Sequence, residues 1–165
     1  MQRRTLLAVS AAALAGCGAE AGDTLDTAAA ARRIRARIND VRARVGVGAL
    51  EPSGALQTAA QVHSRDMHAR EFYGHENPDG EQPWDRVACQ ADEAIHRGEV
   101  GRMQNIDSEQ TWNAGTTDGL AGYVVEGWEL SRPHRETITD DAYARVGVGV
   151  VVRDAEWFAT AMFCR

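Results

Sequence analysis

Three cysteines, Cys17, Cys89 and Cys164, are the residues whose chemistry is easiest to specify in this sequence. Cys17 ends the stretch Leu-Ala-Gly-Cys, directly after an apolar run of small and aliphatic residues over 5–15. Small residues before a cysteine at this place resemble a lipobox, in which the cysteine is lipidated and the chain is cleaved before it. The sequence therefore predicts a lipid anchor on Cys17. The alternative is a plain secretory signal with a chance cysteine.

The other two cysteines suggest a covalent cross-link. An exported chain enters an oxidising compartment, where a pair of cysteines is a disulfide candidate. A bridge between Cys89 and Cys164 would close a long loop and stabilise the fold by about 4 kcal/mol on the chain-entropy account. The alternative is two buried thiols.

Histidine and serine side chains raise the question of catalysis. Ser131 lies three residues before His134, a spacing that invites a nucleophile–base interpretation. The sequence contains neither H-E-x-x-H nor G-x-S-x-G, the motifs of two large hydrolase classes. His63 lies on the apolar face of a predicted helix, where a hydrogen-bonded core histidine is expected rather than a ligand.

The amino-terminal segment is expected to direct export. Arg3 and Arg4 precede the apolar run, which is about half the ~20 residues that a membrane-spanning helix needs. Residues 1–16 are therefore predicted to be a signal peptide, loosely of the twin-arginine type. The small and acidic residues of 17–26 are predicted to be a tether, and 27–165 a single folded domain.

The charge balance is acidic and free of lysine. The formal net charge is −6, and all 18 basic residues are arginine. This balance argues against nucleic acid as a partner, because phosphates would be repelled. It suggests a halophilic protein, or equally a GC-rich genome. Six arginines between 32 and 44 have helical spacing beside an apolar stripe, which indicates a solvated helix face.

Apolar periodicity predicts helices first and strands last. Ile34, Ile38 and Val41 mark one stripe of a helix over about 27–44. A second helix is predicted from the N-cap Ser53 to about 71, and a third over about 117–130. A short helix is predicted to carry Trp84, Val87 and Ala88, whereas 90–120 shows no clean periodicity. Val-rich 144–152 and aromatic-rich 156–164 predict two strands, so the fold class is α+β.

Four ordered blocks stand out along this framework. Within 61–86, a helix ending in Asp-Met is followed by an aromatic-Gly-His step, a Pro-Asp-Gly turn and an arginine. Residues 103–106 are Met-Gln-Asn-Ile, 124–138 contain Val-Val-Glu-Gly-Trp and Arg-Pro-His-Arg, and 146–149 are Val-Gly-Val-Gly. Together these blocks resemble the CAP superfamily (the cysteine-rich secretory, antigen 5 and pathogenesis-related proteins) in its bacterial or archaeal extracellular branch. The similarity covers about 34–163.

The resemblance implies a three-layer α-β-α sandwich with a cleft that presents two histidines and two acidic residues. His75 and His134 take the histidine positions, and two imidazoles of this kind can coordinate Zn²⁺ or another divalent cation. Gln104 stands where the family has the glutamate of Gly-Glu-Asn-Ile and is expected to orient the imidazoles. The second acidic residue of the family's cleft would lie at position 122 or 123, where this sequence has Gly122 and Tyr123. Glu126 is its nearest helical replacement, although an exposed helix glutamate is the simpler expectation.

By the same resemblance, Ser131 is a structural serine at the turn after the third helix. Arg86 and Arg135 are expected to brace the fold through carboxylate pairs.

Three functions follow from these features. The favoured one is a lipid-anchored cell-surface module whose histidine cleft binds a ligand or cation without turnover; the ligand would be a lipid, a small molecule or a protein. The first alternative is a metal-dependent extracellular peptidase or esterase, weakened by the missing His–carboxylate pair. The second is a structural envelope protein whose histidines form a polar network.

Overall fold

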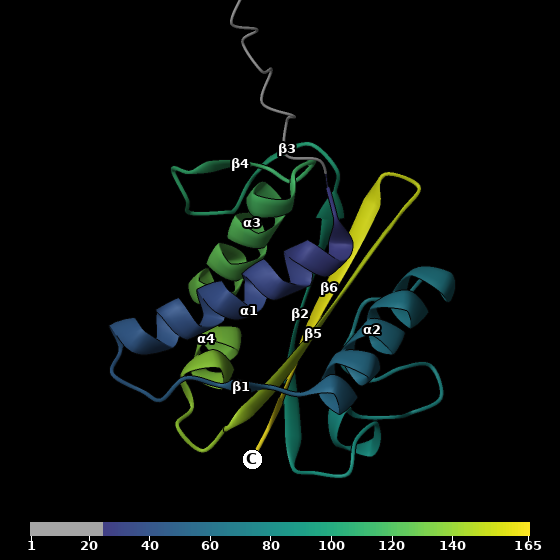
Figure 1. Ribbon diagram of the computed structural model, residues 1–165. Helices are drawn as coiled ribbons and strands as arrows, with labels where there is room; N and C mark the ends of the chain where they lie inside the picture. Colours follow the sequence, from purple (N-terminus) through teal and green to yellow (C-terminus); the bar gives the residue numbers. More distant parts are fainter. Residues whose placement is uncertain (1–24) are drawn as a thin grey trace, which may run out of the picture.

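The computed structural model describes residues 25–165 (Figure 1). The predicted signal peptide, the lipidation site Cys17 and most of the predicted tether lie outside these residues. Among the helices of 25–165, none has both the length and the apolar character needed to cross a membrane.

A four-stranded sheet forms the centre of the fold, in the order β1-β5-β6-β2. Strands β5 and β6 form an antiparallel hairpin, β2 lies antiparallel to β6, and β1 lies parallel to β5. β2 is therefore an edge strand. A separate two-stranded sheet pairs β3 with β4. The bounds are β1 Glu51–Pro52, β2 Ala91–Glu99, β3 Arg102–Gln104, β4 Thr111–Asn113, β5 Arg145–Arg153 and β6 Glu156–Cys164.

Helices cover both faces of the sheet, as Figure 1 shows. Helices α1, α3 and α4 lie on one face, and α2 packs on the other. The bounds are α1 Thr27–Arg44, α2 Gly54–Ala69, α3 Thr117–Leu130 and α4 Arg132–Thr139, with a 3₁₀ helix η1 at Pro83–Asp85. The predicted α+β class and three-layer α-β-α sandwich are confirmed.

Side-chain alternation along β5 explains how the two helical layers approach the sheet. Val146, Val148 and Val150 join the core cluster that contains the apolar stripe of α1. Positions 147 and 149 lie on the opposite face of the sheet, toward α2, because successive strand residues alternate between faces. A Cβ on Gly147 would lie 2.0 Å from the main-chain nitrogen of Gln57. The glycines thus let the backbone of α2 rest directly on the sheet.

Several predicted elements are confirmed and others are corrected. The helix predicted over 27–44 is α1, capped by Asp26, and Ser53 caps α2 by accepting from the amide of Leu56 at 3.4 Å. The Cys89–Cys164 disulfide is present and closes a separation of 75 residues. The short helix predicted around Trp84 is wrong beyond the three residues of η1, and 90–120 contains three strands.

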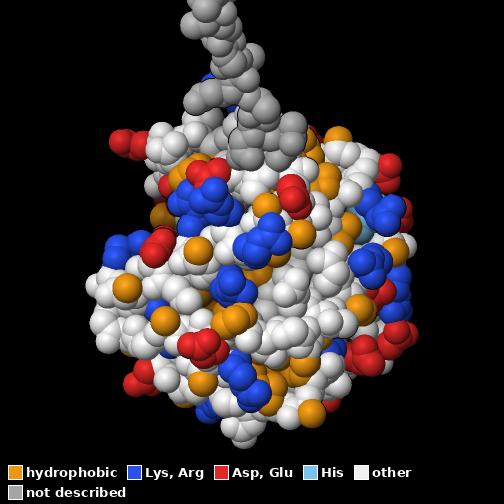
Figure 2. All heavy atoms as spheres, in the orientation of Figure 1, with side chains coloured by type: hydrophobic (Ala, Val, Ile, Leu, Met, Phe, Trp, Pro, Cys, Tyr) orange, Lys and Arg blue, Asp and Glu red, His pale blue; other side chains and the backbone are white. Residues whose placement is uncertain are grey.

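The surface over α1 carries charges of both signs, which Figure 2 shows interspersed on one face of the molecule. Arg37 contacts Asp118 at 3.1 Å, and Arg44 contacts Glu129 at 2.5 Å. Arginines of α1 are thus paired with carboxylates of α3. Such exposed pairs contribute little to stability, about 0–1 kcal/mol each.

Candidate functional site

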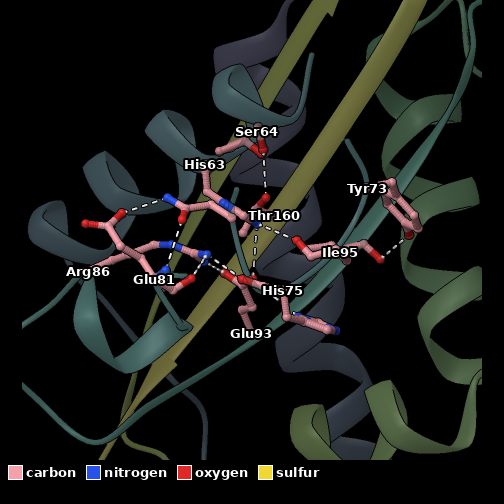
Figure 3. A network of polar contacts seen from close by, with 12 residues as sticks. His63, Ser64, Tyr73, His75, Glu81, Arg86, Glu93, Ile95 and Thr160 are labelled. Carbon is pink, nitrogen blue, oxygen red and sulfur yellow. Dashed lines mark hydrogen bonds and ion pairs between the residues drawn. The ribbon is translucent and has the colours of Figure 1, made fainter. Parts of the chain in front are cut away.

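The candidate site is built on a carboxylate that the sequence analysis did not single out, Glu93 on β2 (Figure 3). Its side chain is fully buried. Glu93 Oε1 lies 3.2 Å from His75 Nδ1 and 3.2 Å from His63 Nε2, and Oε2 accepts from Arg86 Nη1 at 2.9 Å. Two histidines and an arginine therefore converge on one buried anion.

The network keeps Glu93 ionised. Burial alone would raise its pKa, but hydrogen bonds from His63 and His75 and the charge of Arg86 lower the pKa to about 2. Arg86 also donates to the main-chain carbonyls of His75 and Glu81. The segment that carries His75 is therefore tied to the same carboxylate through Arg86, which makes the carboxylate pair expected from the sequence.

The neighbours of each imidazole indicate its tautomer. His63 Nε2 faces two acceptors, Glu93 and the carbonyl of Gly74 at 3.0 Å, so this nitrogen must carry a hydrogen. His63 is a buried, hydrogen-bonded core histidine. His75 Nδ1 must donate to Glu93, which leaves the lone pair of a neutral His75 ring on Nε2. The side chain of His75 is 44% exposed.

His134 meets His75 from the other helical layer. The two ring centroids are 5.9 Å apart at an interplanar angle of 60°. His75 follows α2, whereas His134 lies on α4, so the pair spans the open edge of the sheet at β2. Burial and the neighbouring His75 lower the pKa of His134, which Asp92 partly offsets. His134 therefore favours its neutral form.

Side chains from both layers also cover the main chain of this edge. The carbonyl of Ile95 accepts from the Tyr73 hydroxyl at 3.1 Å and from the Trp128 indole at 2.9 Å. An edge strand with free backbone groups is open to pairing with other chains, and these bonds occupy one such group.

The structure does not bring Gln104 or Glu126 to the histidine pair. Gln104 is exposed on β3, and its amide donates to the carbonyl of Ser108. Glu126 accepts from Asn105, Ser108 and Trp112 at 2.8, 2.7 and 2.9 Å. Glu126 is thus neither a solvated helix glutamate nor a partner of the imidazoles: it holds the segment that links β3 to β4.

A fourth histidine, His96, joins the network of Glu126. Asn105 links them, donating to Glu126 and placing its oxygen 3.5 Å from His96 Nε2. His96 Nδ1 accepts from the amide of Arg97, so Nε2 carries the hydrogen of the neutral ring. Burial between Tyr123 and Trp157 lowers the pKa of His96 to about 4; Asn105 opposes this shift and His134 adds to it.

The position of Glu93 corrects the placement of one sequence block. Residues 92–95 are Asp-Glu-Ala-Ile, which keep the acid and the isoleucine of Gly-Glu-Asn-Ile at the same spacing. The structure places this glutamate, not Gln104, beside His75. A His–carboxylate pair is therefore present, contrary to the expectation from 103–106. Arg135 also departs from expectation, because it donates to the carbonyl of Glu129 rather than to a carboxylate.

The donor set limits the kind of metal that the site would hold. Within residues 25–165, no three His, Cys, Asp or Glu side chains are arranged to hold a metal ion. Structural zinc sites use four protein ligands and catalytic sites usually three. The histidine pair by itself therefore fits at most a cation with water or ligand atoms as its other partners.

Comparison with known proteins identifies the class to which this fold and site belong. Residues 35–164 match the cysteine-rich secretory protein family, CAP, and the chain therefore belongs to that family. No curated protein matches the sequence significantly.

Solved structures share the fold. An extracellular protein containing a SCP domain from Bacillus anthracis str. Ames is 25% identical, with a TM-score of 0.64 over 84% of this chain and 41% of that one. This chain thus spans about two fifths of that protein. An outer surface protein from Borrelia burgdorferi is 16% identical, with a TM-score of 0.68 over 87% and 98% of the chains. NaASP2, solved with Zn²⁺, is 12% identical, with a TM-score of 0.58 over 90% and 83%.

Proposed function

We propose that this chain is an exported CAP protein, held at the cell surface by lipid on Cys17, whose His75–His134 pair binds a ligand or cation without turnover. The membrane is its partner through the anchor, and the ligand is a lipid, a small molecule or a protein rather than nucleic acid. Export is supported by the relatives described as an extracellular protein and an outer surface protein.

The observation that carries the proposal is the bond between buried Glu93 and His75 Nδ1. Ligand-binding histidines commonly donate one ring N–H to a carboxylate, which fixes the ring and raises the basicity of the other nitrogen. Here the other nitrogen belongs to a partly exposed ring that faces a second, mostly neutral imidazole. The pair thus offers acceptor nitrogens suited to a hydrogen-bond donor or a borderline cation.

A bound divalent cation would be held by His75 and His134, with Glu93 supporting the first of them from behind. The NaASP2 structure with Zn²⁺ makes zinc the sensible probe. Because only two imidazoles meet here, we expect exchangeable binding rather than a permanent structural ion.

Calorimetric titration of Zn²⁺ into the chain from residue 18 onward tests the site, alongside His75→Ala and His134→Ala. His68→Ala is the matched control, because His68, in the last turn of α2, contacts Asp154 and not the Glu93 network. Saturable binding that both site variants lose and the control keeps is the expected result. Unchanged binding in either site variant would contradict the proposal for a cation.

The anchor is tested separately from the site. Cys17→Ser is expected to abolish incorporation of labelled fatty acid and the cleavage before residue 17, so that an unprocessed precursor accumulates. Labelling or cleavage at this place that survives the substitution would show that Cys17 is not the anchor.

One observation favours a second function, extracellular hydrolysis. A carboxylate-oriented imidazole such as His75 can act as a general base. Against this, the hydrogen bond of His75 within residues 25–165 goes to a carboxylate and not to a serine, threonine or cysteine side chain. Peptide and ester hydrolysis by the wild type, lost in Glu93→Gln, would replace the binding proposal by this one.

A further inference from the structure

A hollow of about 310 Å³ lies beside the histidine pair, between the carboxyl-terminal half of α3 and the turn after β3. Ser131, three residues before His134, lies on its wall. The hollow is separate from the Glu93 network. Its lining residues are His96, Gln104, Asn105, Ile106, Asp107, Tyr123, Gly127, Leu130 and Ser131.

Two aliphatic side chains give the hollow an apolar wall. Ile106 is 87% exposed and Leu130 is 46% exposed, although both are strongly apolar. They come from different elements, the 104–107 turn and the end of α3. Glu126 fixes the turn through Asn105 and Ser108, so Ile106 is held in place by a hydrogen-bonded support. Exposed apolar side chains around a concavity are typical of a ligand site.

Tyr123 supplies an unused hydrogen-bonding group on the lining. The residue is 7% exposed, yet its hydroxyl has no hydrogen-bond partner among residues 25–165. No side-chain nitrogen or oxygen in this part of the chain is both inaccessible and unbonded. The hydroxyl is therefore accessible to solvent, and the hollow is the cavity that Tyr123 lines. A buried tyrosine hydroxyl normally has a partner, so this one is available to a ligand.

The charges around the hollow select the kind of ligand. Asp107 lies on the lining, and the charge of Glu126 adds to burial in raising the pKa of Tyr123. These carboxylates repel an anion. The hydrogen on His96 Nε2 already points to Asn105, so the lining donors left for a ligand are the hydroxyls of Tyr123 and Ser131. A ligand that bonds to them must present an acceptor, which an ammonium group lacks. An uncharged acceptor fits both conditions.

We propose that this hollow binds an uncharged aliphatic carbonyl compound, whose oxygen accepts from the Tyr123 hydroxyl and whose chain lies between Ile106 and Leu130. The inference deepens the proposed function, because it gives a chemical class to a ligand beside the histidine pair. It does not require that either histidine bind metal.

The test uses three probes with one alkyl chain: hexanamide, hexanoate and hexylamine. Each is titrated into ¹⁵N- and methyl-labelled protein and followed by NMR. We expect hexanamide to shift the Ile106 and Leu130 methyl signals saturably, and the two charged probes to bind about tenfold more weakly or not at all. Equal affinity for hexanamide and hexanoate would overturn the proposal.

Variants locate the contacts. Tyr123→Phe removes only the hydroxyl and is expected to weaken hexanamide binding about threefold to tenfold. Tyr143→Phe is the matched control, because Tyr143 is equally buried and lines a different groove. Ile106→Ser is expected to weaken binding as well, whereas Val45→Ser, at an exposed aliphatic residue of the α1 end, is not. No difference between the members of either pair would overturn the proposal.

The same titration separates this inference from the proposed function. In His75→Ala, hexanamide binding is expected to persist while Zn²⁺ binding is lost. Loss of hexanamide binding in a folded His75→Ala protein would contradict an independent hollow. Loss of Zn²⁺ binding alone, or its absence from the wild type, would bear only on the histidine pair.

Discussion

Glu93 and Glu126 are both carboxylates that accept from three side chains, but their partners differ in kind. Glu93 is bound by two histidines and an arginine inside the α2 layer, whereas Glu126 is bound by an amide, a hydroxyl and an indole in the α3 layer. Glu93 has no solvent exposure, while Glu126 retains some. A fully buried anion needs a cationic partner, because desolvation is too costly for neutral donors alone to offset.

The difference also separates two roles. In the Glu93 network, His75 uses one nitrogen internally and keeps the other for a ligand. In the Glu126 network, Asn105, Ser108 and Trp112 use their donors to hold the 105–112 segment in place. β2 serves both: Glu93 points to one face of the sheet and His96, three residues later, to the other. The edge strand β2 therefore contributes to both networks: to the one that supports the His75–His134 pair and to the one that holds the 105–112 segment.

Removing each carboxylate should give the largest contrast. Glu93→Ala leaves the buried Arg86 and His63, and the partly exposed His75, without their anion, and we expect a loss of about 3–5 kcal/mol in the free energy of unfolding. Glu126→Ala leaves neutral donors that water can reach, and about 1–2 kcal/mol is expected. Urea denaturation followed by circular dichroism measures both. Equal losses would show that the cationic partner Arg86 is not what distinguishes the two networks.

A double variant sharpens this test. If an uncompensated Arg86 causes most of the cost, Glu93→Ala combined with Arg86→Ala should be less destabilised than the sum of the single variants. Additive losses would place the cost in the histidines instead.

Acid should remove the stability that depends on the two regions in separate pH windows. The pKa of His96 is lowered from 6.5 to about 4, so the unfolded chain binds a proton that the native chain does not, and stability falls as pH drops from 6.5 toward 4. The pKa of Glu93 is lowered from 4.5 to about 2, so its contribution is present above pH 4.5 and is lost as pH falls toward 2.

Each window is expected to remove on the order of 3 kcal/mol. Urea midpoints measured from pH 8 to pH 2 should therefore decline in two stages, and His96→Phe should flatten only the upper stage. A variant that retained the full decline between pH 6.5 and 4.5 would rule out His96 as its source.

The sequence predicted the elements that carry regular apolar patterns. Ile34, Ile38 and Val41 indicated α1 by their spacing, and the Val-rich run of 144–152 predicted β5. β2 escaped notice because its buried positions include Glu93 and its edge position leaves polar residues between them, so no alternation of apolar residues marks the strand. The pairing of β2 with β6, rather than a local sequence pattern, makes that segment a strand. Without that strand the carboxylate of Glu93 has no place in the motif, because Gln104 in Met-Gln-Asn-Ile matches the position of the family's glutamate.

Site residues that lie in short sequence motifs could be predicted, whereas those placed by contacts between distant segments could not. His75 and His134 lie in motifs that the sequence shows, and the structure places their rings side by side. The support of Glu126 for the 105–112 segment depends on contacts across at least 14 residues, which no helical spacing reveals. The sequence likewise did not show that residues after Ser131 continue as α4, the helix that carries His134.

A substitution that crowds the Glu126 network should destabilise the protein less than the removal of a carboxylate does. A Cβ on Gly127 would lie 2.4 Å from His96 Nε2 and 2.9 Å from the side-chain oxygen of Asn105. His96 is held between Tyr123 and Trp157 and cannot easily move, so Gly127→Ala is expected to cost about 1–3 kcal/mol. Gly54→Ala, where a Cβ meets open space, should change stability by less than about 1 kcal/mol. Similar values for the two variants would mean that the His96–Asn105 contact yields without cost.

His134→Ala should have the smallest effect on stability and the clearest effect on binding. Within residues 25–165, the His134 side chain makes no hydrogen bond and touches His75 through its ring. Truncating a half-buried side chain without such bonds is expected to cost less than about 1 kcal/mol. Zn²⁺ binding should nevertheless disappear, because one imidazole alone is a weak ligand set. A structural envelope protein predicts the reverse: a loss of several kcal/mol and no binding to lose. Thermal unfolding and calorimetry on the same His134→Ala sample therefore decide whether the histidines face a ligand or merely hold the two layers together.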